Sequence, residues 1–241
     1  MAFNNVDESI SSLESKPQNV KNQAWELQTE SYIEQERIWP KNGQHILAHF
    51  DEKSVVVYQA FKKTIASYAV ENQRFGGPDY NPDRMSWIKP NFMWMMYRCG
   101  WAQKTNQERV LAVRITREGF EDILSKAYTA WRQKSEGLQT SNIEVRLQWD
   151  PDHNPHGVKL ERRAIQLGLK GKTLRAFTDD YILNIKDITD FVKEQYNVLQ
   201  QKGPKALLSP KERVFVPSRD KTCSDIGLDF VPQQTVVSFT S

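Results

Sequence analysis

Two short runs of β-branched residues, each followed directly by a helical pattern, constrain the fold of this chain more than any other feature. Residues 55–61 (VVVYQAF) are too few for a buried helix, so they predict a buried strand. A helix is expected after it, with Thr64 as its N-cap and an end before Gly76. Residues 110–115 repeat this order, and Thr116 is placed to cap the next helix. The pattern predicts strands and helices that pack together.

The same reasoning supplies the other elements. Apolar and polar residues alternate over 143–149, which is typical of a strand buried on one face. Further strands are expected at 164–169 and 181–185, and further helices at 24–38, 117–130 and 191–201. This order predicts an α+β fold: a single compact domain over residues 23–202, with a mixed or antiparallel central sheet flanked by helices.

Both ends of the chain differ from this central part. Residues 1–22 are polar and predict a mobile acidic tail, and residues 203–241 are basic, proline-punctuated and without periodicity, which predicts a tail that wraps the domain. The start carries Asp7 and Glu8 and lacks the basic and apolar regions of a secretory signal. No apolar run approaches the ~18–20 residues of a membrane span. We therefore expect a cytoplasmic protein with no membrane partner.

Charge is distributed unevenly, although the net charge is only +3. Residues 1–40 hold three basic and seven acidic side chains, whereas residues 84–117 hold seven basic side chains and a single acid, Glu108. A basic block of this kind favours a partner with phosphate groups, such as a nucleotide or a nucleic acid. The histidines and cysteines lack the spacing of a metal site, so no metal is predicted.

Residues 84–101 (RMSWIKPNFMWMMYRCGW) hold three of the seven tryptophans and four of the five methionines. If a helix begins at Pro90, its aromatic residues form one stripe, which is typical of a core helix. The interleaved Lys89 and Arg98 suggest a second interpretation, because cations beside flat rings suit phosphate contact together with stacking on a base or a nicotinamide. The two interpretations are compatible. The chain has no glycine-rich phosphate loop, so a nucleotide would have to bind without one.

The segments SWIKPNFMWMMYRCGWA and ERVLAVRITREGF, together with residues 55–61 and 73–75, resemble the family catalogued as domain of unknown function 4291. That family is in turn similar to ADP-ribosyltransferase-like folds, which hold NAD between strands. The resemblance implies that Tyr58 and Gln59 occupy the first motif, Ser86 and Trp87 the second, and Gln166 the third. Gln59 stands where such enzymes usually carry Arg or His. In ADP-ribosyltransferase-like enzymes an acidic residue orients the ribose and the acceptor. Its conceivable counterpart in this sequence is Asp150 or Glu161.

Three hypotheses follow. Two of them assign a function to the basic aromatic segment, and the third is an interaction or structural protein in which the aromatic residues form only core. The first is a nucleotide-cofactor-using transferase, specifically an NAD-dependent ADP-ribosyltransferase acting on nucleic acid or protein. Its catalytic residues would be Gln59, Gln166 and Asp150, and its cofactor-binding residues Tyr58, Arg74, Arg84, Ser86, Trp87, Lys89 and Arg98. The alternative is a non-catalytic nucleic-acid-binding module that uses the basic aromatic segment 84–117.

Overall fold

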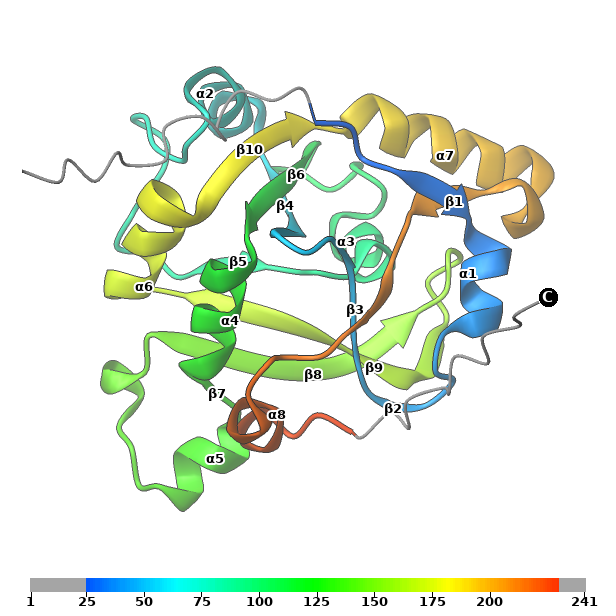
Figure 1. The fold of residues 1–241 in the computed structure, drawn as a ribbon. Coiled ribbons are helices and arrows are strands. Elements are labelled where there is room, and N and C mark those ends of the chain that lie inside the picture. The colour runs from blue at the N-terminus through cyan, green and yellow to red at the C-terminus, as the bar shows by residue number, and fades with distance from the viewer. Residues whose placement is uncertain (1–24, 230–241) are drawn as a thin grey trace, which may run out of the picture.

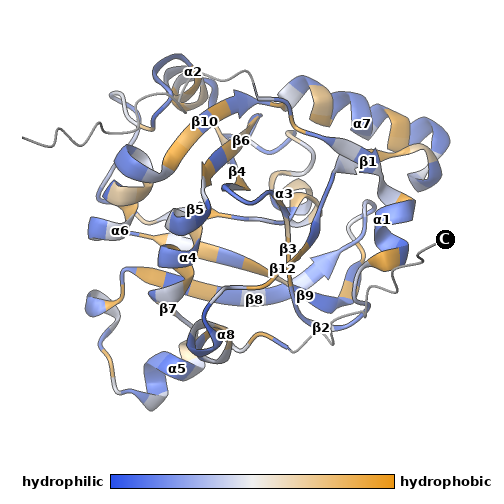
Figure 2. Ribbon diagram, in the orientation of Figure 1, coloured by the Kyte–Doolittle hydropathy of each residue, from blue (hydrophilic) through white to orange (hydrophobic). Residues whose placement is uncertain are grey.

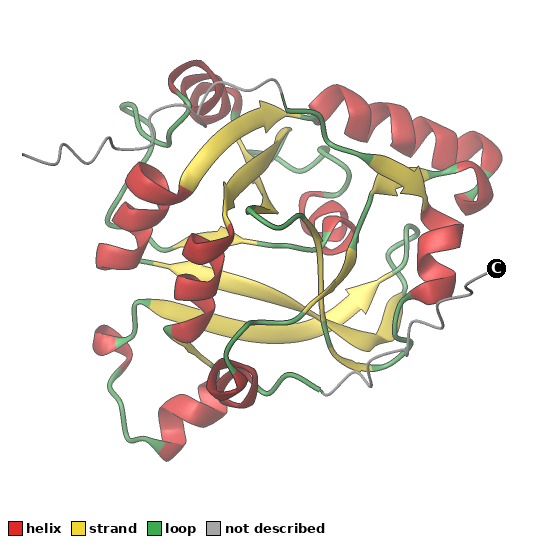
Figure 3. Cartoon of the chain, viewed as in Figure 1, coloured by secondary structure: helices red, strands yellow, loops and turns green. Residues whose placement is uncertain are grey.

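Two five-stranded sheets form the centre of the computed structural model, which describes residues 25–229 (Figures 1 and 3). The first sheet is antiparallel throughout, with the order β10 (Ile182–Asp187), β6 (Arg109–Thr116), β4 (Ser54–Phe61), β3 (Ile46–Phe50) and β12 (Arg213–Phe215). The second is mixed, with the order β2 (Gly43–Gln44), β9 (Lys159–Leu169), β8 (Val145–His153) and β7 (Ala127–Tyr128), and β5 (Ser86–Ile88) pairs with β9. A separate pair joins β1 (Thr29–Ser31) to β11 (Leu208–Pro210).

Eight α-helices surround these sheets in the described part of the chain. They are α1 (Tyr32–Ile38), α2 (Lys63–Asn72), α3 (Phe92–Cys99), α4 (Arg117–Ser125), α5 (Ala130–Ser135), α6 (Gly171–Ala176), α7 (Thr189–Lys202) and α8 (Asp220–Ile226). Short 3-10 turns lie at Thr140–Asn142 and Pro204–Ala206, and a π-helical turn follows α6 at Phe177–Tyr181. No described helix is long and apolar enough to cross a membrane. The result is a compact α+β domain.

Strand β4 has an unbroken apolar run over residues 55–58 because both of its faces are buried there. Val55 and Val57 contribute to one hydrophobic cluster, whereas Val56 and Tyr58 contribute to another on the opposite face. A strand buried on both faces needs no polar alternation. Strand β6 pairs with β4 over eight residues, and it is similarly apolar. These two strands are the centre of the first sheet.

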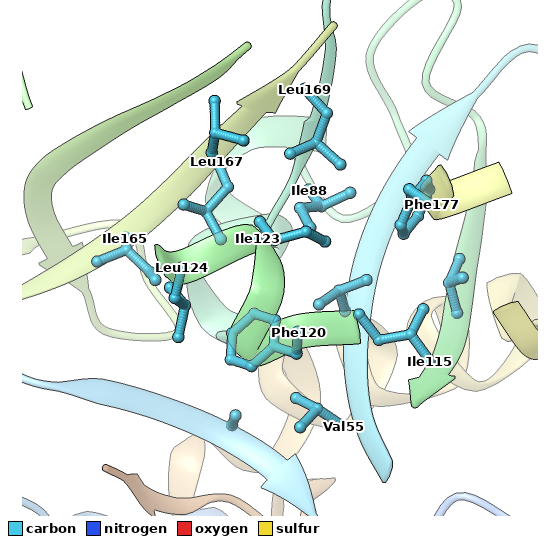
Figure 4. Packing of buried hydrophobic residues seen from close by; sticks show 14 of the residues in the cluster. Val55, Ile88, Ile115, Phe120, Ile123, Leu124, Ile165, Leu167, Leu169 and Phe177 are labelled. Carbon is cyan, nitrogen blue, oxygen red and sulfur yellow. The ribbon is translucent and has the colours of Figure 1, made fainter. Parts of the chain in front are cut away.

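One hydrophobic cluster joins the two sheets through α4. Phe120 and Ile123 of α4 pack among Ile115 of β6 and Ile165 and Leu167 of β9 (Figure 4). The cap predicted for this helix is confirmed, because the Thr116 side chain accepts a hydrogen bond from the Gly119 N–H at 3.0 Å.

A second cluster covers the other face of the first sheet, beneath α3 and α7. Phe92 and Met96 of α3 and Val192 and Leu199 of α7 belong to it. Figure 2 shows apolar and polar bands alternating along α7, as expected for a helix with one face on the core.

Residues 204–226, which the sequence pattern placed in a C-terminal tail, belong to the domain. Strand β12 closes one edge of the first sheet against β3, and β11 pairs with β1 near the start of the described chain. The strands are only three residues long, so they carry no periodic signal. The predicted tail over 1–22 and the part of 203–241 beyond residue 229 lie outside the described residues.

Several element boundaries also differ from the prediction. Helix α3 begins at Phe92 rather than Pro90, because Asn91 is its N-cap and accepts a hydrogen bond from the Trp94 N–H at 2.7 Å. Helix α2 begins at Lys63, before Thr64. The segment predicted as helix 24–38 contains β1 as well as α1.

Candidate binding cleft

Strand β5 brings the two sheets together at one point. It pairs with β9 of the second sheet, and Lys89, the next residue, forms a bridge to Tyr58 of β4 in the first sheet (Figure 1). The Tyr58 N–H donates to the Lys89 carbonyl at 2.7 Å, and the Lys89 N–H donates to the Tyr58 carbonyl at 3.1 Å. The residues of β5 are therefore fixed beside the end of β4.

A cleft of about 780 Å³ opens at this junction. It has the size of an ordinary small-molecule or cofactor site. Its walls include most of the residues singled out from the sequence: Gln59, Arg84, Ser86, Trp87, Lys89, Arg98 and Gln166. They come from β4, the 79–85 loop, β5, α3 and β9. Gln59 and Gln166, which are far apart in the sequence, thus line the same cleft.

Three residues of the predicted site are not among those that line the cleft. Tyr58 is fully buried and its ring packs edge-on against Phe92, with 5.5 Å between ring centroids, so it is a core residue. Arg74 points elsewhere and forms an ion pair with Asp179 at 3.0 Å. Asp150 is connected to the cleft indirectly, because its carboxylate accepts a hydrogen bond from Gln166 at 2.8 Å.

Two side-chain amides in the cleft wall are held by hydrogen bonds. The Gln59 amide nitrogen donates to the Ser86 hydroxyl at 2.8 Å and to the Trp87 carbonyl at 3.2 Å, and its oxygen is buried without a partner among residues 25–229. The Gln166 amide nitrogen donates to Gln148 at 2.9 Å as well as to Asp150. A fixed amide presents its free lone pairs in a defined direction. Both amides therefore face the same cleft from different strands.

Lys89 is the most unusual residue of the cleft. Its side chain is only 5% exposed, and its ammonium group makes no hydrogen bond or ion pair with any described residue. Burial, reinforced by the nearby Arg98 guanidinium, lowers its pKa to about 8. Buried lysines are uncommon unless they are paired. An unpaired one beside a cleft is therefore a candidate for ligand contact.

Positive charge is concentrated in this cleft. Arg84 and Arg98 are exposed and form no ion pair within the described chain, so with Lys89 they make three cations without acidic partners. The fourth, Lys62, pairs with Asp79 at 2.9 Å. Three unpaired cations around a space that holds few acids attract an anion.

The other basic residues of segment 84–117 are turned toward groups of the protein itself. Arg109 donates to Asp187 at 2.6 Å, Arg114 donates to Ser54 at 2.8 Å, and Lys104 donates to the Arg98 carbonyl at 2.9 Å. The basic block of the sequence therefore does not form one continuous free surface. Outside this segment, Arg162 of β9 is also buried in an ion pair, with Asp152 at 2.7 Å.

The sequence did not indicate the contribution of Lys62, Asp79 and Asn106 to the cleft wall. Lys62 follows directly on the last residue of β4, and its position at a strand end was the one available signal. Asp79 and Asn106 lie in loops, and only the tertiary structure brings loops to a cleft.

Aromatic residues 94 and 101 belong to the core rather than the cleft, being 5% and 7% exposed. Trp87 is half-buried and lines the cleft, so it is the indole that a ligand can reach. Within residues 25–229, no cluster of three or more His, Cys, Asp or Glu side chains is arranged to hold a metal ion.

These features define an α+β domain with a basic cleft at the junction of two sheets. The chain belongs to the family described as Domain of unknown function (DUF4291), whose profile matches residues 45–215. The match includes all the cleft residues named above, and it ends at the last residue of β12. A comparison with curated proteins gave no match.

Proposed function

We propose that the cleft binds a nucleotide cofactor and that the protein transfers a group from it, with NAD-dependent ADP-ribosyl transfer as the specific reaction. One observation carries this proposal: Arg84, Lys89 and Arg98 line the cleft and have no acidic partner in the described chain. A pyrophosphate supplies the negative charge that these groups lack. Trp87 offers a ring on which a base or nicotinamide can stack.

The chemistry of the walls fits NAD in particular. Lys89, Arg84 and Arg98 would hold its pyrophosphate, and Trp87 would contact a flat ring. When bound, NAD supplies an activated bond between ribose and nicotinamide. The carboxylate of Asp150 accepts a hydrogen bond from the lining residue Gln166, and its negative charge behind that wall would favour positive charge that develops on a reacting centre. Gln59, fixed by Ser86, would position polar groups of the ligand or acceptor.

The alternative of a non-catalytic nucleic-acid module receives less support. A long polyanion requires a continuous run of free cations. Arg109 and Arg114 of segment 84–117 are instead bonded to Asp187 and Ser54. The cations without partners gather around a single cleft, which suits a compact anion better.

Isothermal titration calorimetry with NAD, ADP-ribose, ATP and inorganic pyrophosphate tests the proposal. We expect binding in the micromolar to millimolar range that weakens as salt is raised from 50 to 200 mM. The variants Arg84→Ala and Arg98→Ala should each weaken binding by about tenfold to a hundredfold, since each removes a charge-assisted contact worth roughly 1.5–3 kcal/mol. Both side chains are exposed, so the fold should be unaffected.

Arg74→Ala is the matched control, because Arg74 is also exposed and basic but pairs with Asp179 away from the cleft. It should leave the affinity unchanged. Release of nicotinamide from NAD, followed by chromatography, tests the transfer step separately. If none of the four compounds binds, or if Arg74→Ala weakens binding as much as Arg98→Ala, the proposal is wrong.

A further inference from the structure

The main chain of Lys89 is held by the sheet junction, and its amine has no counter-ion among the described residues. The two backbone hydrogen bonds to Tyr58 fix its main chain. Its side chain is 5% exposed and lines the cleft, and no described acidic group lies within ion-pair distance of it. An unpaired primary amine beside a cleft can act as a nucleophile as well as a cation.

The surroundings of Lys89, taken together, favour the neutral amine. Arg98 on α3 repels the ammonium form and burial removes its hydration, whereas Cys99 on α3 and Asp150 on β8 act in the opposite direction. The net effect is the lowered pKa of about 8. At pH 7.5 about a quarter of such an amine is neutral, compared with about one part in a thousand for an exposed lysine with a pKa near 10.4.

We propose that Lys89 forms an imine with phosphorylated carbonyl compounds, such as the open-chain form of a sugar phosphate, that occupy the cleft. The amine nitrogen attacks the carbonyl carbon, and a C–N bond forms. The carbonyl oxygen then leaves as water with the two protons of the amine, which yields a C=N bond without any oxidant or reductant. Arg84 and Arg98 hold the phosphate, so the proposal rests on the anion binding of the proposed function.

Pyridoxal 5′-phosphate is a suitable probe, because it carries an aldehyde and a phosphate. The full chain is treated with a substoichiometric amount at pH 7.5, the imine is reduced with borohydride, and the labelled lysines are mapped by peptide mass spectrometry. We expect Lys89 to be labelled at least about tenfold faster than two internal controls. These are Lys63, which is exposed on α2, and Lys62, which lines the same cleft but is paired with Asp79.

Two further comparisons test the role of the phosphate. Inorganic pyrophosphate should slow labelling of Lys89 at least about tenfold and leave Lys63 unaffected. Pyridoxal, which lacks the phosphate, should label Lys89 about tenfold more slowly than the phosphorylated probe. Lys89→Arg removes the nucleophile, but it places a larger group in a buried position, so pyrophosphate protection of the unaltered chain is the decisive measurement.

The outcomes separate this inference from the proposed function. Equal labelling of Lys89 and Lys63 overturns the inference even if nucleotides bind in calorimetry, and the proposed function then stands. Selective, pyrophosphate-sensitive labelling of Lys89 supports the inference, and if NAD and ATP fail to bind in the same preparation, the nucleotide proposal alone is lost. Labelling of Lys89 that pyrophosphate does not slow overturns the inference.

Discussion

Lys89 is placed where it can contact a ligand in the cleft, but its burial lowers the stability of the fold. Lys89 is buried and its ammonium has no counter-ion in the described chain, so burial disfavours the charged form and lowers the pKa to about 8. A buried charge of this kind is retained at functional sites although it destabilises the protein. An apolar residue of similar length would therefore suit the fold better.

Lys89→Met should raise the free energy of unfolding at pH 7 by up to about 3 kcal/mol, because that is the approximate cost of lowering the pKa of the lysine from its ordinary value to about 8. The folded protein binds this proton less tightly than the unfolded chain, so the stability of the unaltered protein rises as the pH increases from about 8 toward 10.4. The advantage of Lys89→Met should thus shrink by about 2 kcal/mol between pH 7 and 9.5. Urea denaturation at both pH values measures it.

Lys63→Met is the control for this prediction, because Lys63 is exposed on α2. Its effect should stay within about 0.5 kcal/mol at both pH values. Should Lys89→Met prove less stable than the unaltered protein at pH 7, Lys89 would have a stabilising partner, and the argument for an unpaired amine would be wrong.

Among the helices, α3 connects the second hydrophobic cluster to the cleft. Its buried face carries Phe92 and Met96, and its last turn carries Arg98. The start of the helix is fixed by Asn91, whose amide nitrogen also donates to the buried carboxylate of Glu212 at 3.1 Å. The position of Arg98 therefore depends on a cap that lies at the opposite end of its helix.

Asn91→Ala should lower the free energy of unfolding by about 2–4 kcal/mol. It removes the cap, worth about 1 kcal/mol, and it leaves a buried carboxylate oxygen without its donor. Thr129→Ala is the matched cap variant, because Thr129 caps the short α5, which has no buried residue. It should lower stability by about 1 kcal/mol or less. Equal losses in the two variants would show that the contact with Glu212 contributes nothing.

The sequence predicted the elements whose signal is local. Strands β4 and β6 were recognisable because burial on both faces favours the apolar runs at 55–58 and 110–113. The same property explains why Tyr58 was predicted to bind a cofactor although it is a core residue. Within an apolar run, the sequence does not distinguish a residue that faces the core from one that faces a cleft. Arg74 was predicted to line the cofactor site but pairs with Asp179 outside the cleft. The sequence could not indicate this pair, because the two residues are distant along the chain and only the fold brings them together.

The cleft itself was predicted in part. The concentration of aromatic and basic residues over 84–101 indicated Trp87, Lys89 and Arg98, all of which line it. The meeting of β4, β5 and β9 could not be predicted, because it depends on strand pairing between segments that are far apart along the chain.

The molecule as a whole is completed by a segment that has no periodic pattern. Strand β12 lies at the edge of the first sheet, and its last residue, Phe215, is fully buried. The Phe215 ring packs edge-on against Phe50 and Phe120, with centroid distances of 5.2 and 5.1 Å. The Arg117 guanidinium lies 5.0 Å from the centroid of the same ring. Strand β12 thus joins the first sheet to α4.

Phe215→Ala should therefore destabilise the entire domain by about 3–5 kcal/mol, the usual loss for removing a buried aromatic ring. The neighbouring Val216→Ala provides the control, because Val216 is 50% exposed and should change stability by no more than about 0.5 kcal/mol. Urea denaturation followed by tryptophan fluorescence measures both, and the large loss should appear in a single cooperative transition. If Phe215→Ala behaves like Val216→Ala, residues 213–215 are an appendage of the domain and not part of its core.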